Sequence, residues 1–207
     1  VPITIYKGHD PGWYAPPFEN LKQFGIPDNT FVVACTVRGV RRKGVPVLLE
    51  AIDNLPPDLN IHFLLAGTNM DNSHHKKLVK ENRYRANIHL HGFLKRMPWI
   101  LPNCHVSVLP ALRREGLPRG IIEAMIGGTV PIVTQSGGSP ELVENGKSGF
   151  VVPPGKSEPI TKAILELYNN ENLYSAMQCA AQERIKNKFR VEDTAKKLIA
   201  LYHGLVA

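Results

Sequence analysis

Cysteine is scarce in this chain of 207 residues, which contains only Cys35, Cys104 and Cys179. The number is odd and no C-x-x-C pair occurs, so the sequence predicts neither a disulfide framework nor a redox or zinc motif. Cys35 and Cys104 lie in apolar, strand-like runs, where free thiols of a core are expected in a reducing compartment. The chain also lacks an N-x-S/T glycosylation sequon, which agrees with a cytoplasmic location.

Long apolar runs are missing as well. No segment approaches the ~20 apolar residues that cross a bilayer, and the first residues do not resemble a signal peptide. The formal net charge is +7, but no basic run is interleaved with aromatic residues, so we expect no nucleic-acid partner. A basic balance also fits a phosphorylated ligand or an anionic membrane surface. We therefore expect a cytoplasmic protein, with peripheral contact at the inner face of the membrane as an alternative.

Several phosphate and metal motifs are absent. Gly146-Lys147 looks like the end of a phosphate-binding loop, but Glu141 stands where the first glycine of that loop is required. No G-x-G-x-x-G follows a strand, and no Asp-x-Asp pair is present for a metal-bound diphosphate. The histidines at 74, 75, 89 and 91 lack further ligands at a suitable spacing. We expect a site without a metal or a cofactor.

Short apolar segments alternate with helical ones along most of the chain. This order predicts parallel β-α-β units with right-handed crossovers, and hence an α/β fold: a Rossmann-like, doubly wound parallel sheet with helices on both faces. Ligands bind such sheets at the carboxyl ends of the strands, so the candidate site loops are 38–43, 67–72, 92–96, 110–118 and 135–139. The expected strands are 31–37, 61–66, 87–91, 105–109, 130–133 and 150–152, and the expected helices 45–55, 73–82, 97–101, 115–123, 158–169, 171–188 and 191–205.

The middle of the chain carries the most informative pattern. Glu115 and Glu123 lie eight positions apart and flank Gly116-Leu117-Pro118, and a small-residue turn and an apolar strand follow. Pro118 suits the first turn of a helix, where a missing N–H costs nothing. Free amides around Leu117, Arg119 and Gly120 would then form an anion site at the helix N-terminus, while the carboxylates accept hydrogen bonds from vicinal hydroxyls. The combination favours a sugar nucleotide, with plain surface charge as the alternative.

A basic turn follows the first predicted strand. Arg38 and Lys43 flank this strand-to-helix turn, at the expected carboxyl edge of the sheet. A forked guanidinium and a mobile ammonium can neutralise a diphosphate without a metal. On spacing alone a solvated basic turn is the alternative, and the two glutamates downstream favour the diphosphate.

A second turn, Gly137-Gly138-Ser139-Pro140-Glu141, is predicted to lead into a helix. Ser139 has the residue type of an N-cap, and the two glycines allow a close backbone approach. The turn is interpreted first as a structural cap, and second as a supporting wall of a pocket.

Together these motifs resemble the C-terminal, donor-binding half of GT-B glycosyltransferases of the retaining family 4 (group 1), over nearly the whole chain. The family's Gly-Arg-Leu and Lys-Gly motif is matched by Val37-Arg38-Gly39 and Lys43-Gly44, its E-x7-E signature by Glu115 and Glu123, and its Gly-Gly-x-Pro-Glu by residues 137–141. Residues 88–110 resemble its strand, glycine, short helix and strand. Val37 replaces the usual glycine before Arg38, so the backbone approach to the phosphate is expected to differ.

The resemblance implies a role for each matched residue. The predicted catalytic residues are Arg38 and Lys43, which hold the donor diphosphate and stabilise it as it departs, and Glu115, which binds hydroxyls of the transferred sugar. Glu123 binds the nucleotide ribose. Transfer of a hexose from the nucleotide diphosphate sugar retains the anomeric configuration and needs no metal. Main-chain groups are expected to read the base at Gly92, Phe93 and Leu94, and to contact the sugar and phosphate at Gly116, Leu117, Pro118 and Arg119.

The resemblance also implies a domain organisation. Residues 1–18 match the interdomain connection, residues 19–190 the nucleotide-sugar donor-binding domain, and residues 191–207 the C-terminal crossing helix. An acceptor-binding N-terminal domain does not fit into 207 residues, so we expect half of an enzyme of envelope polysaccharide or lipopolysaccharide synthesis, inactive alone. The alternative is a non-catalytic sugar-nucleotide-binding subunit that acts with a separate acceptor-binding chain.

Overall fold

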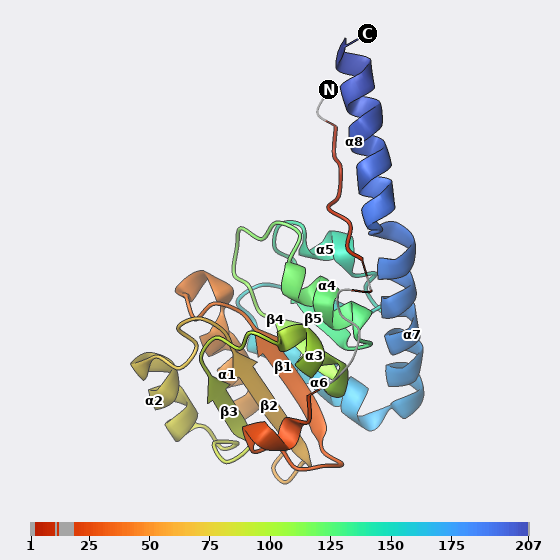
Figure 1. Ribbon diagram of the computed structural model, residues 1–207. Helices are drawn as coiled ribbons and strands as arrows, with labels where there is room; N and C mark the ends of the chain where they lie inside the picture. Colours follow the sequence, from red (N-terminus) through yellow and green to blue (C-terminus); the bar gives the residue numbers. More distant parts are fainter. Residues whose placement is uncertain (1–2, 11, 13–18, 207) are drawn as a thin grey trace.

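The computed structural model describes residues 3–10, 12 and 19–206. Its strands are β1 (Phe31–Thr36), β2 (Ile61–Ala66), β3 (Ile88–His91), β4 (Val106–Leu109), β5 (Val130–Thr134) and β6 (Phe150–Val152). They form one parallel sheet in the order β3-β2-β1-β4-β5-β6 (Figure 1). The order changes direction between β1 and β4, and α/β sheets bind ligands at such a switch point.

Helices surround this sheet. The α-helices are α1 (Val45–Asp53), α2 (Ser73–Glu81), α3 (Met97–Ile100), α4 (Arg119–Ile126), α5 (Ser139–Leu142), α6 (Ser157–Asn169), α7 (Glu171–Lys188) and α8 (Val191–Val206), and the short 3-10 helices are η2 (Leu21–Phe24), η3 (Arg41–Lys43) and η4 (Leu101–Asn103).

Both faces of the sheet are covered by other elements. Successive side chains of a strand point to opposite faces, so one strand can contribute to two core clusters. In β1, Val33 and Cys35 belong to the larger core cluster, to which α1 and α6 contribute. Val32 and Ala34 belong to the smaller cluster on the other face, together with η4 and Ala124 of α4. The predicted α/β fold, a doubly wound parallel sheet with helices on both faces, is therefore confirmed.

Each predicted strand is present with its ends within one residue of the expected positions. The expected starts of two helices were wrong. The helix expected over residues 115–123 is α4, which begins at Arg119. Pro118 does not lie in the first turn of α4 but directly before it, with an extended backbone (φ −74°, ψ 108°). Ser139 is not an N-cap: α5 begins at Ser139, Gly138 is the cap residue, and the buried Ser139 hydroxyl has no hydrogen-bond partner among the described residues. Gly137, which directly precedes the cap residue, has a left-handed backbone (φ 55°).

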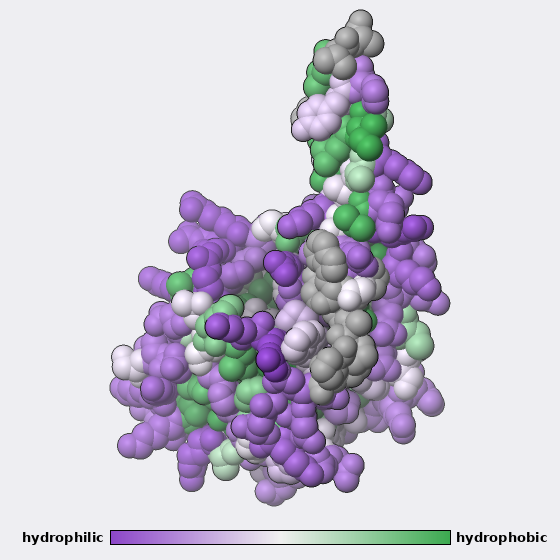
Figure 2. Space-filling model, viewed as in Figure 1, coloured by the Kyte–Doolittle hydropathy of each residue, from purple (hydrophilic) through white to green (hydrophobic). Residues whose placement is uncertain are grey.

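The last helix, α8, projects away from the sheet, and residues 3–8 run beside it (Figure 1). Thr194 ties the two together, since its Oγ1 accepts the N–H of Gly8 and donates to the carbonyl of Tyr6, both at 2.7 Å. Half of the predicted connection, residues 1–2, 11 and 13–18, lies outside the described part. Within that part no helix is long and apolar enough to cross a membrane. Exposed apolar side chains gather on α8 (Figure 2): Leu198, Ile199, Tyr202 and Leu205.

Candidate functional site

The candidate site is a hollow at the carboxyl edge of the sheet, at the switch point between β1 and β4. It measures about 380 Å³ and is bounded by the end of β1, the loops after β2 and β3, and the start of α4. Three cations and one carboxylate line it: Arg38, Lys95, Arg119 and Glu123. The other lining residues are Thr36, Val37, Ala66, Gly67, Thr68, Phe93, Leu94, Met97, Pro98 and Gly120.

A second hollow of about 240 Å³ adjoins the first. The two share Thr36, Val37, Arg119 and Gly120, so they form one bent cleft around the first turn of α4, which we call the α4 cleft. The second hollow continues to a further ion pair, Lys43 and Glu115, and its other lining residues are Val108, Leu109, Leu117, Pro118 and Ile121. The two predicted glutamates thus lie in opposite arms of the cleft.

The first turn of α4 lies at the bend of the α4 cleft. The extended backbone of Pro118 ends the preceding loop, and the N–H groups of Ile121 and Ile122 are the first to reach its carbonyl, at 3.1 and 3.3 Å. Earlier N–H groups of a helix have no intrahelical acceptor, and the helix dipole adds partial positive charge there. Gly120 also allows this turn to approach β1, since a Cβ at that position would lie 2.9 Å from Thr36 Oγ1.

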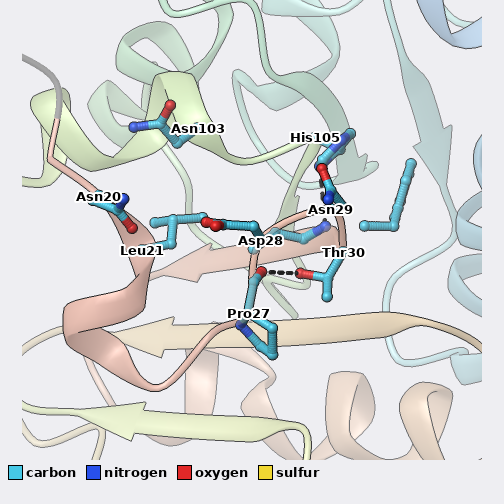
Figure 3. A pocket seen from close by; sticks show the side chains of 10 residues that line it. Asn20, Leu21, Pro27, Asp28, Asn29, Thr30, Asn103 and His105 are labelled. Atoms are coloured by element: carbon cyan, nitrogen blue, oxygen red, sulfur yellow. Dashed lines mark hydrogen bonds between the residues drawn. The ribbon is translucent and has the colours of Figure 1, made fainter.

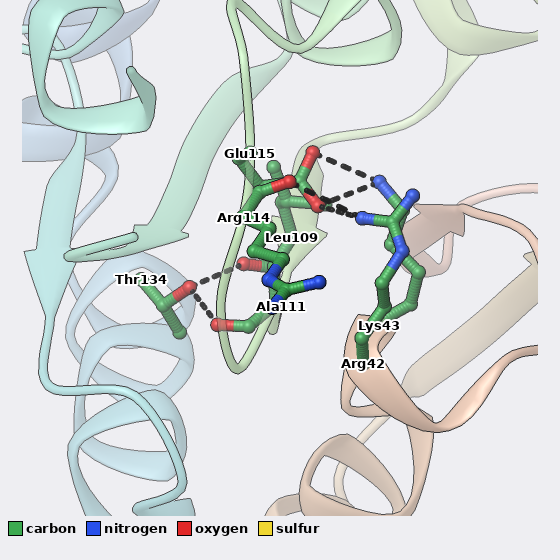
Figure 4. A network of polar contacts seen from close by, with 7 residues as sticks. All are labelled: Arg42, Lys43, Leu109, Ala111, Arg114, Glu115 and Thr134. Atoms are coloured by element: carbon green, nitrogen blue, oxygen red, sulfur yellow. Dashed lines mark hydrogen bonds and ion pairs between the residues drawn. The ribbon is translucent and has the colours of Figure 1, made fainter. Parts of the chain in front are cut away.

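Glu115 is held by two cations from the turn after β1 (Figure 4). The Lys43 ammonium lies 2.8 Å from Oε1 and 2.9 Å from Oε2, and Nη1 of Arg42 lies 3.3 Å from Oε1. The Glu115 side chain is only 6% exposed and that of Lys43 13% exposed. The burial of this carboxylate is compensated by counter-charges in direct contact with it.

Glu123 has a different environment, in the other arm. Its Oε1 accepts a 2.7 Å hydrogen bond from Nε of Arg119, one helical turn earlier. The Glu123 side chain is 11% exposed, whereas that of Arg119 is 66% exposed. Burial raises the pKa of the Glu123 carboxyl, and the hydrogen bond and charge of Arg119 offset this rise only in part.

Two glycines brace the loop that carries Glu115. A Cβ on Gly137 would lie 1.8 Å from the carbonyl oxygen of Glu115, and one on Gly138 would lie 2.7 Å from that of Gly116. The N–H of Gly138 donates to the Glu115 carbonyl at 3.1 Å. The Gly-Gly turn therefore supports the wall of the α4 cleft, which is the second of the two roles expected for it.

The structure brings most of the predicted site residues to this cleft. Arg38, Phe93, Leu94, Arg119 and Glu123 line one arm, and Lys43, Glu115, Leu117, Pro118 and Arg119 line the other. Gly92 and Gly116 line neither arm, and the Gly92 carbonyl instead accepts the N–H of Gly67 at 3.1 Å. Thr36, Lys95 and Arg42 were not among the predicted site residues. Thr36 could have been predicted, because it lies near the carboxyl end of a predicted strand, where ligands bind such sheets.

A larger hollow of about 760 Å³ lies at the opposite edge of the sheet, where β1 and β4 begin (Figure 3). Its described lining contains asparagines and Asp28 but no lysine or arginine. His105 borders it and is committed to the sheet, because its Nδ1 accepts the N–H of Val32 at 3.0 Å. The α4 cleft therefore fits an anionic ligand better than this hollow does.

Solved structures share this fold, and some of them are named as glycosyltransferases. HepE from Anabaena, in complex with UDP-glucose, superposes with a TM-score of 0.85 at 23% identity, over 97% of this chain and 57% of that one. A glycosyltransferase from Rickettsia africae superposes with a TM-score of 0.91 at 20% identity, over 99% of this chain and 57% of that one. The fold is thus that of a GT-B glycosyltransferase domain.

The chain belongs to the family described as glycosyl transferases group 1, whose model matches residues 18–184. Glycogen synthase of Thermodesulfovibrio yellowstonii is 30% identical over 179 residues, which are 84% of this chain and 35% of that protein. The putative colanic acid biosynthesis glycosyltransferase WcaL of Salmonella typhimurium is 26% identical over 192 residues, which are 88% of this chain and 46% of that protein. The chain thus spans less than half the length of these two relatives.

Proposed function

We propose that this chain is the nucleotide-sugar donor-binding half of a retaining glycosyltransferase of family 4. Residues 19–190 would form the donor-binding domain, residues 1–18 the connection to an acceptor-binding domain, and residues 191–207 a helix that crosses back to it. The observation that carries the proposal is the α4 cleft, where a helix N-terminus lies between two arms that each contain cations and a buried glutamate.

Each part of a nucleotide diphosphate sugar has a matching part of this cleft. The first turn of α4, Arg38 and Lys43 supply positive charge for the diphosphate. Glu123 is the acceptor for the ribose hydroxyls and Glu115 for those of the transferred hexose. The base would lie against Phe93 and Leu94, and Phe93, a residue that is 69% exposed, is available for stacking.

Transfer breaks the bond between the anomeric carbon and the diphosphate, and a new bond forms to an acceptor hydroxyl with retention of configuration. The electron pair of the broken bond stays on the phosphate oxygen, where Arg38 and Lys43 stabilise the added charge. The acceptor hydroxyl loses its proton in the same exchange, and the departing nucleotide diphosphate can take it up. No metal or cofactor is needed for this charge balance. The acceptor must be held by another domain, so we expect the isolated chain to bind donor without transferring it.

The names of the relatives support a role in polysaccharide synthesis. One is named as a glycogen synthase and another as a putative colanic acid glycosyltransferase, so both names refer to the synthesis of a polysaccharide. HepE was solved with UDP-glucose, a nucleotide diphosphate hexose. We propose that this chain acts in envelope polysaccharide or lipopolysaccharide synthesis on the cytoplasmic side, with an acceptor-binding domain as partner and peripheral contact with the membrane.

The test is calorimetric titration of the folded chain with UDP, GDP and ADP and with their glucose or mannose conjugates. We expect binding of one nucleotide and tighter binding of its sugar conjugate. Glu123→Gln keeps the shape of the side chain but removes its charge, so it should weaken binding of the nucleotide and of its conjugate alike. Failure of every nucleotide to bind a chain shown to be folded would contradict the proposal.

A further inference from the structure

Lys43 has two roles in the proposed function that compete with each other. Its ammonium contacts both carboxylate oxygens of Glu115, at 2.8 and 2.9 Å, yet it is also needed at the donor diphosphate. When the ammonium turns to the diphosphate, Glu115 loses its nearest cation while only 6% of its side chain is exposed. A carboxylate so buried needs another cation in contact with it to compensate its burial.

Arg42 is placed to supply that cation. Among the described residues, Arg42 and Lys43 are the cations within 4.0 Å of the Glu115 carboxylate. The neighbouring Arg41 is exposed and makes no ion pair within the described ranges. Arg42 itself has no other carboxylate partner there, so its charge is directed to Glu115 alone (Figure 4).

Arg42 is also fixed to the loop of Glu115 at both of its ends. Its main-chain carbonyl accepts the N–H of Leu112 at 2.8 Å, and its Nη1 donates to the carbonyl of Arg114 at 3.3 Å. Arg114 has a left-handed backbone (φ 60°), an arrangement that is unfavourable for a residue with a Cβ unless its surroundings hold it. Arg42 therefore stays with the loop, and so with Glu115, when the Lys43 side chain moves.

We propose that Arg42 is a positioning residue that compensates and orients the Glu115 carboxylate for the sugar while Lys43 binds the diphosphate. This inference rests on the proposed function and goes beyond it. It predicts that Arg42 controls the difference in affinity between the nucleotide sugar and the bare nucleotide. Arg42 should have little influence on the nucleotide diphosphate by itself, because it acts through Glu115.

The experiment titrates wild type, Arg42→Gln, Arg42→Lys and Arg41→Gln with UDP and UDP-glucose, or with the GDP or ADP pair if wild type selects that base. Arg42→Gln should weaken binding of the sugar conjugate about tenfold, the loss expected for one contact to a charged group. Binding of the bare nucleotide should change by less than about twofold. Arg42→Lys should recover part of the loss, and the exposed neighbour Arg41→Gln should match wild type.

Equal weakening of nucleotide and conjugate by Arg42→Gln, or no weakening, would overturn the inference while the proposed function stands. A folded wild type that binds neither ligand overturns the proposed function and the inference with it. If Arg42→Gln does not fold, Arg42→Lys still decides, since a shorter, unforked cation should selectively weaken the conjugate. In a Glu115→Gln background the effect of Arg42→Gln should vanish, because the residue it acts through is gone.

Discussion

Glu115 and Glu123 lie in two arms of one cleft, but the chain surrounds them differently. Glu115 contacts two cations that precede it by more than 70 residues and belong to another loop. Glu123 contacts one cation, Arg119, on its own helix, and that cation is mostly exposed. Both carboxylates are buried, yet the first is well compensated and the second is not.

This difference separates two contributions of a buried charge. A compensated carboxylate links distant loops, and its removal leaves cations without a partner. An under-compensated one, whose pKa burial has raised, lowers the stability of the free protein. Such a group is expected where a ligand supplies the missing hydrogen bonds. Neutralising the two glutamates should therefore change stability in opposite directions.

The largest effect is expected for Glu115→Gln. The change leaves the Lys43 ammonium, on a side chain that is only 13% exposed, beside a neutral amide. We expect the free energy of unfolding to fall by about 2 kcal/mol, as measured by denaturant unfolding at neutral pH. Glu144→Gln, whose side chain is 48% exposed and pairs with Lys147 and Arg184, is the control and should change stability much less. An unchanged stability for Glu115→Gln would mean that the two cations do not depend on it.

A smaller loss is expected for Gly138→Ala, which tests the brace on the same arm. The backbone of Gly138 suits alanine (φ −80°), but the added Cβ would lie 2.7 Å from the Gly116 carbonyl oxygen. We expect a loss of about 1–2 kcal/mol as the Glu115 loop shifts, together with weaker preference for the sugar conjugate over the bare nucleotide. Gly116→Ala is the matched control, because nothing lies within 4 Å of a Cβ there. An equal loss of stability in Gly138→Ala and Gly116→Ala would show that Gly138 does not brace the Glu115 loop.

Glu123→Gln should have the opposite sign in the free protein. Its folded pKa is raised, so the folded state holds its proton to higher pH than the unfolded state, and stability falls as the pH rises above about 4.5. The amide removes this loss, and we expect stability at neutral pH to increase by up to about 1 kcal/mol. Nucleotide affinity should fall at the same time. Loss of both stability and affinity would show that Glu123 is a structural residue.

The pH dependence of Glu123 must be separated from that of a histidine pair on β2 and β3. Nδ1 of His62 lies 2.9 Å from Nε2 of His89, and burial, with the charges of His62 and His91, lowers the pKa of His89 to about 4. Because the folded pKa is depressed, stability is complete above the unfolded value of 6.5 and is lost as the pH falls toward 4. His89→Gln should flatten the melting temperature between these limits, with the exposed His74→Gln as control. If the melting temperature of His89→Gln still falls with pH as in wild type, the pH dependence comes from other groups.

The contrast between the arms also explains what the sequence could predict. Strands and helices follow from short-range alternation, so the sheet and its carboxyl edge were predictable. The pairing of Arg119 with Glu123 follows from helical spacing, since residues four apart share a face. The contact of Arg42 with Glu115 spans 73 residues and depends on the η3 turn and on the left-handed Arg114, neither of which a local pattern specifies. The hydrogen bond from the N–H of Gly67 to the carbonyl of Gly92 likewise joins two separate loops, and no local pattern specifies it.

The smallest effect is expected for Arg119→Gln, and it tests how Arg119 takes part in the α4 cleft. Its side chain is 66% exposed, so its ion pair with Glu123 should contribute no more than about 0.5 kcal/mol to stability. If its main chain rather than its side chain contacts the donor, as we expect, nucleotide affinity should change by less than about twofold. A tenfold loss with unchanged melting would instead assign the guanidinium to the diphosphate. The under-compensated arm would then contain a cation that leaves Glu123 when donor binds, as Lys43 is expected to leave Glu115.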